Sequence, residues 1–112
     1  LVKSTGDGIL ATFDGPARAI ACARTLDERL GALELSIRAG VHTGEIELRG
    51  DDIGGLAVHL AARVVAAAEA GEVLVTKVVT DLVAGSNLRF RDRGEHELKG
   101  IEGAWQLFAL DG

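Results

Sequence analysis

The sequence predicts a single α+β domain built on a mainly antiparallel sheet, with helices packed on one face of the sheet. Several short stretches alternate between apolar and polar residues, which is typical of strands, and some follow one another directly, as in hairpins. Two longer stretches repeat apolar residues every three or four positions, which is typical of helices. The 112 residues, 47% of them hydrophobic and 26% charged, suit one folded domain with one core.

The chain begins with a predicted hairpin. Residues 1–3 (LVK) form its first strand and residues 9–13 (ILATF) form the returning strand. Asp7-Gly8 between them is a strong signal for a tight turn, because both residues accept the backbone angles that such turns need. Since the first strand starts without any lead-in, we expect that an N-terminal part of the domain is missing from this sequence.

A helix is predicted to follow the hairpin. It begins at Pro16, with Asp14 as the expected N-cap, and runs to about residue 33. Its apolar residues recur three or four positions apart and should face the core. This expected buried stripe comprises Ala19, Ala23, Leu26, Leu30 and Leu33.

The middle of the chain predicts two strands and a central helix. Residues 35–41 (LSIRAGV) and 45–49 (EIELR) alternate, and the second is expected to pair antiparallel with its neighbour. Residues 50–55 should form a loop, after which a strongly apolar helix runs to about residue 70 and ends at Gly71. A buried strand, a short helix capped by Thr76 and three more strands complete the domain. These last elements span residues 72–76, 77–83, 88–92, 94–98 and 105–110.

Composition excludes several classes of function. The formal net charge is −5 and no basic stripe occurs, which argues against a surface for nucleic acid or anionic membranes. No apolar run approaches the roughly 20 residues of a membrane span. Cys22 is the only cysteine, so an intrachain disulfide is excluded and a cytoplasmic setting is expected. His42 and His96 lie in alternating strands and are assigned no role.

The central helix carries two polar side chains in its first turns. His59 and Arg63 are four residues apart and therefore share one face. The residues around them are apolar, so the helix should be mostly buried. In one interpretation, Arg63 pairs with a nearby acid and His59 is a satisfied core histidine, because an unpaired buried charge is costly. In the other, this face points into a cleft that holds an anionic ligand.

Four other residues also stand out, and each has an ordinary explanation. Lys3 suits an exposed strand, and Asp7 suits a hairpin turn. Asp52 favours the dipole of the helix that follows, and Lys99 suits a turn. None of the motifs HExxH, CxxC, GxSxG or GxxxxGK[ST] occurs in the chain.

The order of these residues resembles the catalytic domain of class III adenylate and guanylate cyclases. The resemblance runs from KSTGDG at residues 3–8, through GVHTGE at 40–45, to DIGGLAVH at 52–59 followed by Arg63. It ends with RG at 93–94 and LKG at 98–100, so it covers essentially the whole chain. The patterns D-x-x-G-x-x-V-N-x-x-x-R and K-x-x-G-D together are specific. They are most similar to those of bacterial, in particular actinobacterial, cyclase domains.

This resemblance implies both a fold and a reaction. Residues 1–112 would belong to one catalytic domain, incomplete at its N-terminus, with a ferredoxin-like core, and the complete domain would work as a head-to-tail homodimer. Residues 1–112 alone are expected to make no detectable cyclic AMP. Its active sites would lie at the dimer interface and draw residues from both chains. The ribose 3′-hydroxyl of the nucleotide would attack the α-phosphate, and pyrophosphate would leave.

The resemblance also implies a role for each candidate residue. Asp7 is similar to one of two aspartates that bind two divalent metal ions, Mg²⁺ or Mn²⁺, for which carboxylates are suitable ligands. Lys3 and Asp52 correspond to the pair that reads the base. Arg63 corresponds to the arginine that stabilises the transition state, and Lys99 to the lysine on the terminal phosphates. An ammonium donor and a carboxylate acceptor match the edge of adenine rather than that of guanine, so ATP is the expected substrate.

Two departures from the family pattern affect the expected function. His59 stands where the family has asparagine; it can still donate a hydrogen bond, but its reach and charge differ. The first metal-binding aspartate of the family belongs to a strand that would precede Leu1. The first hypothesis is an adenylate cyclase that makes cyclic AMP in the cytoplasm. The alternative is a catalytically weak or inactive module that binds nucleotide or mediates dimerisation.

Overall fold

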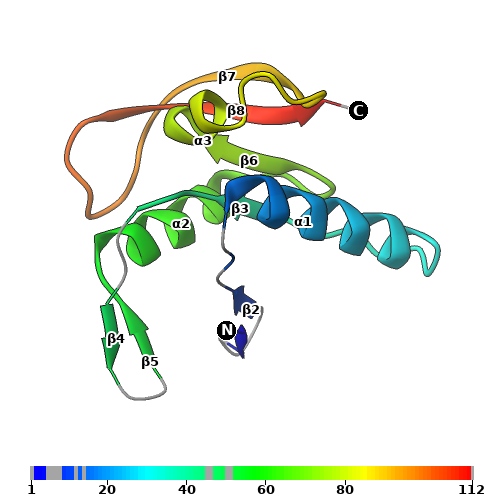
Figure 1. Cartoon of the computed structure of the whole chain (residues 1–112), viewed down its shortest axis with the longest axis horizontal. Helices are drawn as coiled ribbons and strands as arrows, with labels where there is room; N and C mark the ends of the chain where they lie inside the picture. Colours follow the sequence, from blue (N-terminus) through cyan, green and yellow to red (C-terminus); the bar gives the residue numbers. More distant parts are fainter. Residues whose placement is uncertain are drawn as a thin grey trace.

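The computed structural model describes residues 2–4, 9–11, 13, 15–44, 47–49 and 52–111. These residues form an α+β fold in which a four-stranded sheet is the central element (Figure 1). The helices are α1 (Pro16–Gly31), α2 (Leu56–Ala67) and α3 (Lys77–Leu82). The strands are β1 (Val2–Ser4), β2 (Ile9–Ala11), β3 (Ala39–Val41), β4 (Glu47–Arg49), β5 (Asp52–Gly54), β6 (Val73–Thr76), β7 (Arg89–Glu97) and β8 (Ala104–Asp111).

The sheet has the strand order β3-β6-β8-β7 and is mainly antiparallel, as predicted. The pair β3–β6 is parallel, whereas β6–β8 and β7–β8 are antiparallel. The strands β1 and β2 pair antiparallel, which confirms the predicted hairpin pairing, and β4 pairs with β5. These two short pairs lie away from the sheet in Figure 1.

Helices cover both faces of the sheet, so the prediction that they share one face is wrong. In β6, Val73 and Val75 join the apolar cluster under α1 and α3, whereas Leu74 between them joins the cluster under α2. Alternate residues of a strand point to opposite faces. A continuous apolar run such as Val73–Val75 is typical of a strand that is buried on both faces.

Helix α1 begins where the sequence predicts but buries a different stripe. Gly15, not Asp14, occupies the N-cap position, and Pro16 supplies the first helical residue. The fully buried residue is Ile20, while Leu26 is 36% and Leu33 68% exposed. The prediction for Leu26 and Leu33 is therefore wrong. The C-terminal half of α1 extends beyond the strands in Figure 1 and has less of the sheet to pack against.

Three strands differ from their predicted extents. The strand predicted over residues 35–41 is confined to β3, and part of the loop predicted over residues 50–55 is the strand β5. The two strands predicted over residues 88–98 form one strand, β7, with an irregular register between Asp92 and Glu95. Gly94 has a φ angle of 84° there, and its N–H donates to Oδ1 of Asp92 at 2.7 Å. A glycine accepts this backbone conformation without steric cost, so the strand continues past the bulge.

Helix α2 packs unusually close to β3 because Gly40 has no side chain. A Cβ atom at Gly40 would lie 2.6 Å from the backbone N of Val65 and 3.1 Å from the carbonyl O of Ala61. Both of these atoms belong to the helix backbone, which cannot move aside as a flexible side chain would. Below the helix, Leu60 and Val64 are buried in the cluster that includes Leu74. Gly40 therefore sets the depth at which α2 lies on the sheet.

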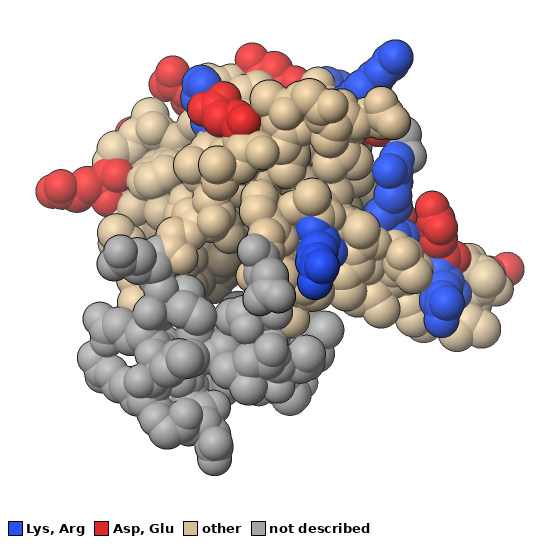
Figure 2. Space-filling model, viewed as in Figure 1, with Lys and Arg blue, Asp and Glu red and all other residues tan. Residues whose placement is uncertain are grey.

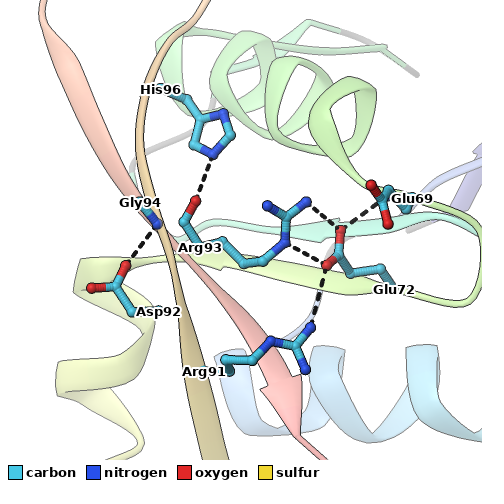
Figure 3. A network of polar contacts seen from close by, with 7 residues as sticks. All are labelled: Glu69, Glu72, Arg91, Asp92, Arg93, Gly94 and His96. Atoms are coloured by element: carbon cyan, nitrogen blue, oxygen red, sulfur yellow. Dashed lines mark hydrogen bonds and ion pairs between the residues drawn. The ribbon is translucent and has the colours of Figure 1, made fainter.

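A group of charged side chains ties the start of β6 to β7, across the strand β8 that separates them (Figure 3). The Nε and Nη2 atoms of Arg93 donate to the two carboxylate oxygens of Glu72 at 2.6 and 3.1 Å. The Nη2 atom of Arg91 lies 3.7 Å from the same carboxylate, and the N–H of Glu69 donates to it at 3.0 Å. The hydrogen bonds from Arg93 are the main reason that the pKa of Glu72 is lowered.

The contact at Gly40 leads to a stability prediction. Gly40→Ala should lower the free energy of unfolding by about 1–3 kcal/mol, because the new methyl group overlaps the backbone of α2. Urea unfolding followed by circular dichroism measures this change. Gly31→Ala is the matched control, since a Cβ there meets no atom within 4 Å, and it should be neutral or slightly stabilising. Equal stability of the two variants would contradict the assigned role of Gly40.

The network around Glu72 predicts how stability depends on pH. The pKa of Glu72 is lowered in the folded protein, so its carboxylate stabilises the fold at pH values above 4.5, the ordinary pKa of a glutamate. That contribution is lost as the pH falls through the lower pKa of the folded state. Glu72→Gln should therefore lower the free energy of unfolding at pH 7. Between pH 5 and about 3, this free energy should fall less in the variant than in the wild-type protein. Urea unfolding over this range is the measurement, with the exposed Glu95→Gln on β7 as a control that should change neither quantity.

Candidate functional site

The candidate site lies where α2 meets the turn between β7 and β8. Helix α2 carries His59 and Arg63, and the turn carries Lys99. A Cβ atom at Gly100 would lie 3.3 Å from Nε2 of His59, so the imidazole ring faces the backbone of the turn. The structure thus brings together two segments that are about forty residues apart in the sequence.

Arg63 is the residue of this site that has an unsatisfied hydrogen-bond donor. Its side chain is half-buried, and its Nε atom is fully buried without a hydrogen-bond partner among the described residues. A buried donor without an acceptor is costly, and a guanidinium group suits carboxylate or phosphate oxygens. The expectation that a nearby acid of this chain satisfies Arg63 is therefore not met at Nε. The arrangement fits an anionic ligand.

His59 is exposed, so the interpretation of this residue as a buried core histidine is wrong. The expectation that α2 is mostly buried is also only partly correct, because Leu56 at its start is 65% exposed. Only Leu60 and Val64 of this helix are fully enclosed by the core. The face of α2 that carries His59 is thus accessible to a ligand.

Lys99 is exposed beside an open hollow of about 520 Å³. Leu98, which precedes Lys99, is only 6% exposed and joins the cluster under α2. The buried leucine fixes the start of the turn, and the lysine ammonium reaches into solvent. The hollow is lined by Glu97, Leu98, Lys99, Ile101, Gly103 and Ala104.

The remaining predicted site residues belong to the two strand pairs that lie away from the sheet. Lys3 lies in β1, where it is paired with Leu10, and Asp52 is the first residue of β5, where it is paired with Arg49. Asp7 lies outside the described residues. The roles predicted for Lys3, Asp7 and Asp52 therefore stay predictions.

The described side chains do not by themselves make a metal site. Among them, no three histidine, cysteine, aspartate or glutamate residues are grouped so that they could hold an ion. The expected metal ligand Asp7 is outside this part of the chain. Its role as a ligand rests on its place in the sequence.

The structure also reveals a polar and aromatic cluster that the sequence interpretation missed. His42 follows β3, and its Nδ1 atom forms a 2.8 Å hydrogen bond with Oγ1 of Thr76. The ring of His42 meets that of Trp105 edge to face, with centroids 6.2 Å apart. Burial lowers the pKa of His42. No spacing along the sequence joins these residues, although Trp105 is the only tryptophan of the chain.

Figure 2 shows how the charged side chains are distributed on one face of the molecule. On the face shown in Figure 2, positive and negative side chains are interspersed and form no continuous basic stripe. None of the helices in the described parts of the chain is both long and apolar enough to span a bilayer.

Comparison with known proteins identifies relatives of this chain. It is 34% identical over 109 residues to the Rhizobium meliloti protein named "Putative adenylate cyclase 3", a match that covers 89% of this chain. It is 36% identical over 112 residues to an uncharacterized protein of Mycobacterium tuberculosis, which covers 98% of this chain. The chain spans only 19% and 29% of the lengths of these two relatives.

The fold is shared with a solved cyclase structure. An adenylate/guanylate cyclase/hydrolase from Silicibacter pomeroyi superimposes with a TM-score of 0.83 at 29% identity, over 97% of this chain and 70% of the other. The profile of the family described as the adenylate and guanylate cyclase catalytic domain matches residues 17–112. These residues include α2, the Lys99 turn and the whole four-stranded sheet, so this chain belongs to the adenylate and guanylate cyclase catalytic domain family.

Proposed function

We propose that residues 1–112 belong to the catalytic domain of an adenylate cyclase, which converts ATP into 3′,5′-cyclic AMP and pyrophosphate for signalling in the cytoplasm. The observation that carries this proposal is the buried, unpartnered Nε atom of Arg63. It lies on the same helix as His59, whose ring faces the backbone next to Lys99. Three potential donors for an anionic substrate thus come from two adjoining segments.

The reaction requires stabilisation of charge on phosphate oxygens. The ribose 3′-hydroxyl gives up its proton to water and its oxygen forms a bond to the α-phosphorus, while the bond from that phosphorus to the pyrophosphate oxygen breaks. Arg63 donates to the phosphate oxygens on which charge builds, and Lys99 holds the departing pyrophosphate. His59 donates a hydrogen bond from a ring nitrogen to the ribose or the α-phosphate. Donors fixed in advance need little rearrangement during the reaction, so they favour the transition state.

Recognition of the base is assigned to Lys3 and Asp52. The Lys3 ammonium would donate to N1 of adenine, and the Asp52 carboxylate would accept from the exocyclic amino group. Guanine presents a donor at N1 and an acceptor at O6, so both contacts would be mismatched. This pairing favours ATP over GTP.

The proposal also includes metal ions and a second copy of the chain. Two divalent ions, Mg²⁺ or Mn²⁺, would neutralise charge on the phosphate oxygens, and Asp7 is the residue of this chain proposed to hold them. A homodimer would complete each site with residues from both copies. Family membership supports both parts of this proposal.

Cyclase activity and its base preference provide the main test. With Mn²⁺, the intact domain should turn over ATP with a kcat/KM at least about tenfold above that for GTP, because each mismatched buried group costs about 1–3 kcal/mol. Chromatography of the products from ATP and GTP is the measurement. Arg63→Ala should lower kcat by on the order of 100-fold, whereas the exposed Arg89→Ala on β7 should not. Equal use of GTP would contradict the base assignment, and nucleotide binding without turnover would favour the non-catalytic alternative.

The role of His59 can be tested separately. His59→Ala should lower kcat by roughly tenfold or more and change KM little, since the lost hydrogen bond acts mainly in the transition state. His59→Asn restores the residue of the family pattern and should retain or raise kcat. Steady-state kinetics of the three proteins decide the matter. Wild-type kinetics in both variants would mean that His59 has no part in turnover.

A further inference from the structure

The turn that carries Lys99 is anchored at Leu98 and Ile101, which pack in the cluster under α2, whereas its exposed residues Lys99, Gly100, Glu102 and Gly103 are not part of that cluster. Gly100 and Gly103 have φ angles of 82° and 90°, and the N–H of Ile101 donates to the carbonyl O of Leu98 at 3.0 Å. Glycine gives a turn freedom as well as access to these conformations. The Lys99 side chain is long, exposed and flexible. The place of its ammonium group therefore depends on how the backbone of the turn is held.

Trp105 holds the far end of this turn. Its indole Nε1–H donates to the carbonyl O of Glu102 at 3.2 Å, and Trp105 itself is the second residue of β8. In β8, Trp105 is paired with His96 of β7, so its backbone is part of the sheet. The indole thus connects a flexible turn to a strand of the sheet.

The Trp105 ring is in turn held by residues at the ends of two other strands. The rings of His42 and Trp105 are almost perpendicular, at 89°. Such an edge-to-face arrangement is favourable and directional. The hydrogen bond to Thr76, which is 1% exposed, fixes the His42 ring from the other side. Burial lowers the pKa of His42 and so favours the neutral form of this ring.

We propose that Trp105, held by His42 and Thr76, is a positioning residue that fixes the Lys99 turn against His59 on α2. The contact of the turn with α2 is the close approach of Gly100 to Nε2 of His59. This proposal rests on the proposed function at one point, namely that Lys99 binds the terminal phosphates of the nucleotide. The position of the turn itself is a property of the protein without substrate.

Trp105→Phe is the appropriate variant, because it keeps an aromatic ring and removes the N–H donor. Amide hydrogen exchange should become about tenfold faster or more at Ile101, whose N–H closes the turn, and should stay unchanged in β6. His42→Gln, which removes the ring that supports the indole, should act in the same direction. If neither variant accelerates exchange at Ile101, the proposal is overturned, whether or not the protein has cyclase activity.

A double-mutant cycle then tests whether Trp105 acts through Lys99. Trp105→Phe should lower kcat/KM for ATP on the order of tenfold in the wild-type protein, but less than about twofold when Lys99→Ala is already present. An equal loss in both backgrounds would overturn the proposal, because it would indicate a general effect on the fold. Phe108→Leu is the matched control on β8, since Phe108 packs in the cluster on the opposite face of the sheet. It should leave both exchange at Ile101 and the coupling to Lys99 unchanged.

These outcomes separate the two proposals. If the wild-type protein makes no cyclic nucleotide, the proposed function fails, and hydrogen exchange still decides whether Trp105 positions the turn. If cyclic AMP forms and the exchange rates do not change, the positioning role fails and the proposed function stands.

Discussion

The arrangement of the candidate site depends on one close contact, between the backbone of α2 and Gly40 of β3. At this point the helix lies so near the strand that no Cβ atom would fit. Because α2 is anchored at this depth, Leu60 and Val64 reach the core and Arg63 lies partly below the surface. The burial of Arg63 Nε, and hence its need for an acceptor, follows from the same contact. Gly40, which has no side chain, therefore influences how deeply the guanidinium group of Arg63 is buried, 23 residues further along the chain.

The second part of the site depends on how the last two strands return to α2. Strands β7 and β8 are joined by the turn that carries Lys99, and Leu98 and Ile101 of this turn pack in the cluster under α2. The Glu72–Arg93 contact ties β7 to the start of β6, at the end of the sheet that lies away from this turn. The arrangement of the candidate site thus depends on packing contacts of residues other than His59, Arg63 and Lys99.

Much of the fold was predictable because its strongest signals are local. The apolar run of β6, the start of α2 after Gly55, and the alternation in β8 all indicated elements that the structure contains, whereas α2 ends at Ala67 and not at Gly71 as predicted. The extent of β3 was not predictable, because residues 35–38 alternate like a strand but find no strand partner. The buried stripe of α1 was also mistaken at Leu33, since burial there depends on where the sheet ends and not on the spacing of leucines.

The sequence by itself determined the types and order of the candidate residues, including the His59–Arg63 spacing on one helix, and this order was sufficient to indicate the family. Only the tertiary structure decided that α2 lies on the opposite face from α1 and α3, and that His59 faces the Lys99 turn. It also brought His42, Thr76 and Trp105 together from three separate strand ends. The physical reason is that sequence periodicity reports which side of an element is apolar. Contacts between distant segments depend instead on packing distances, such as that at Gly40, which no local pattern records.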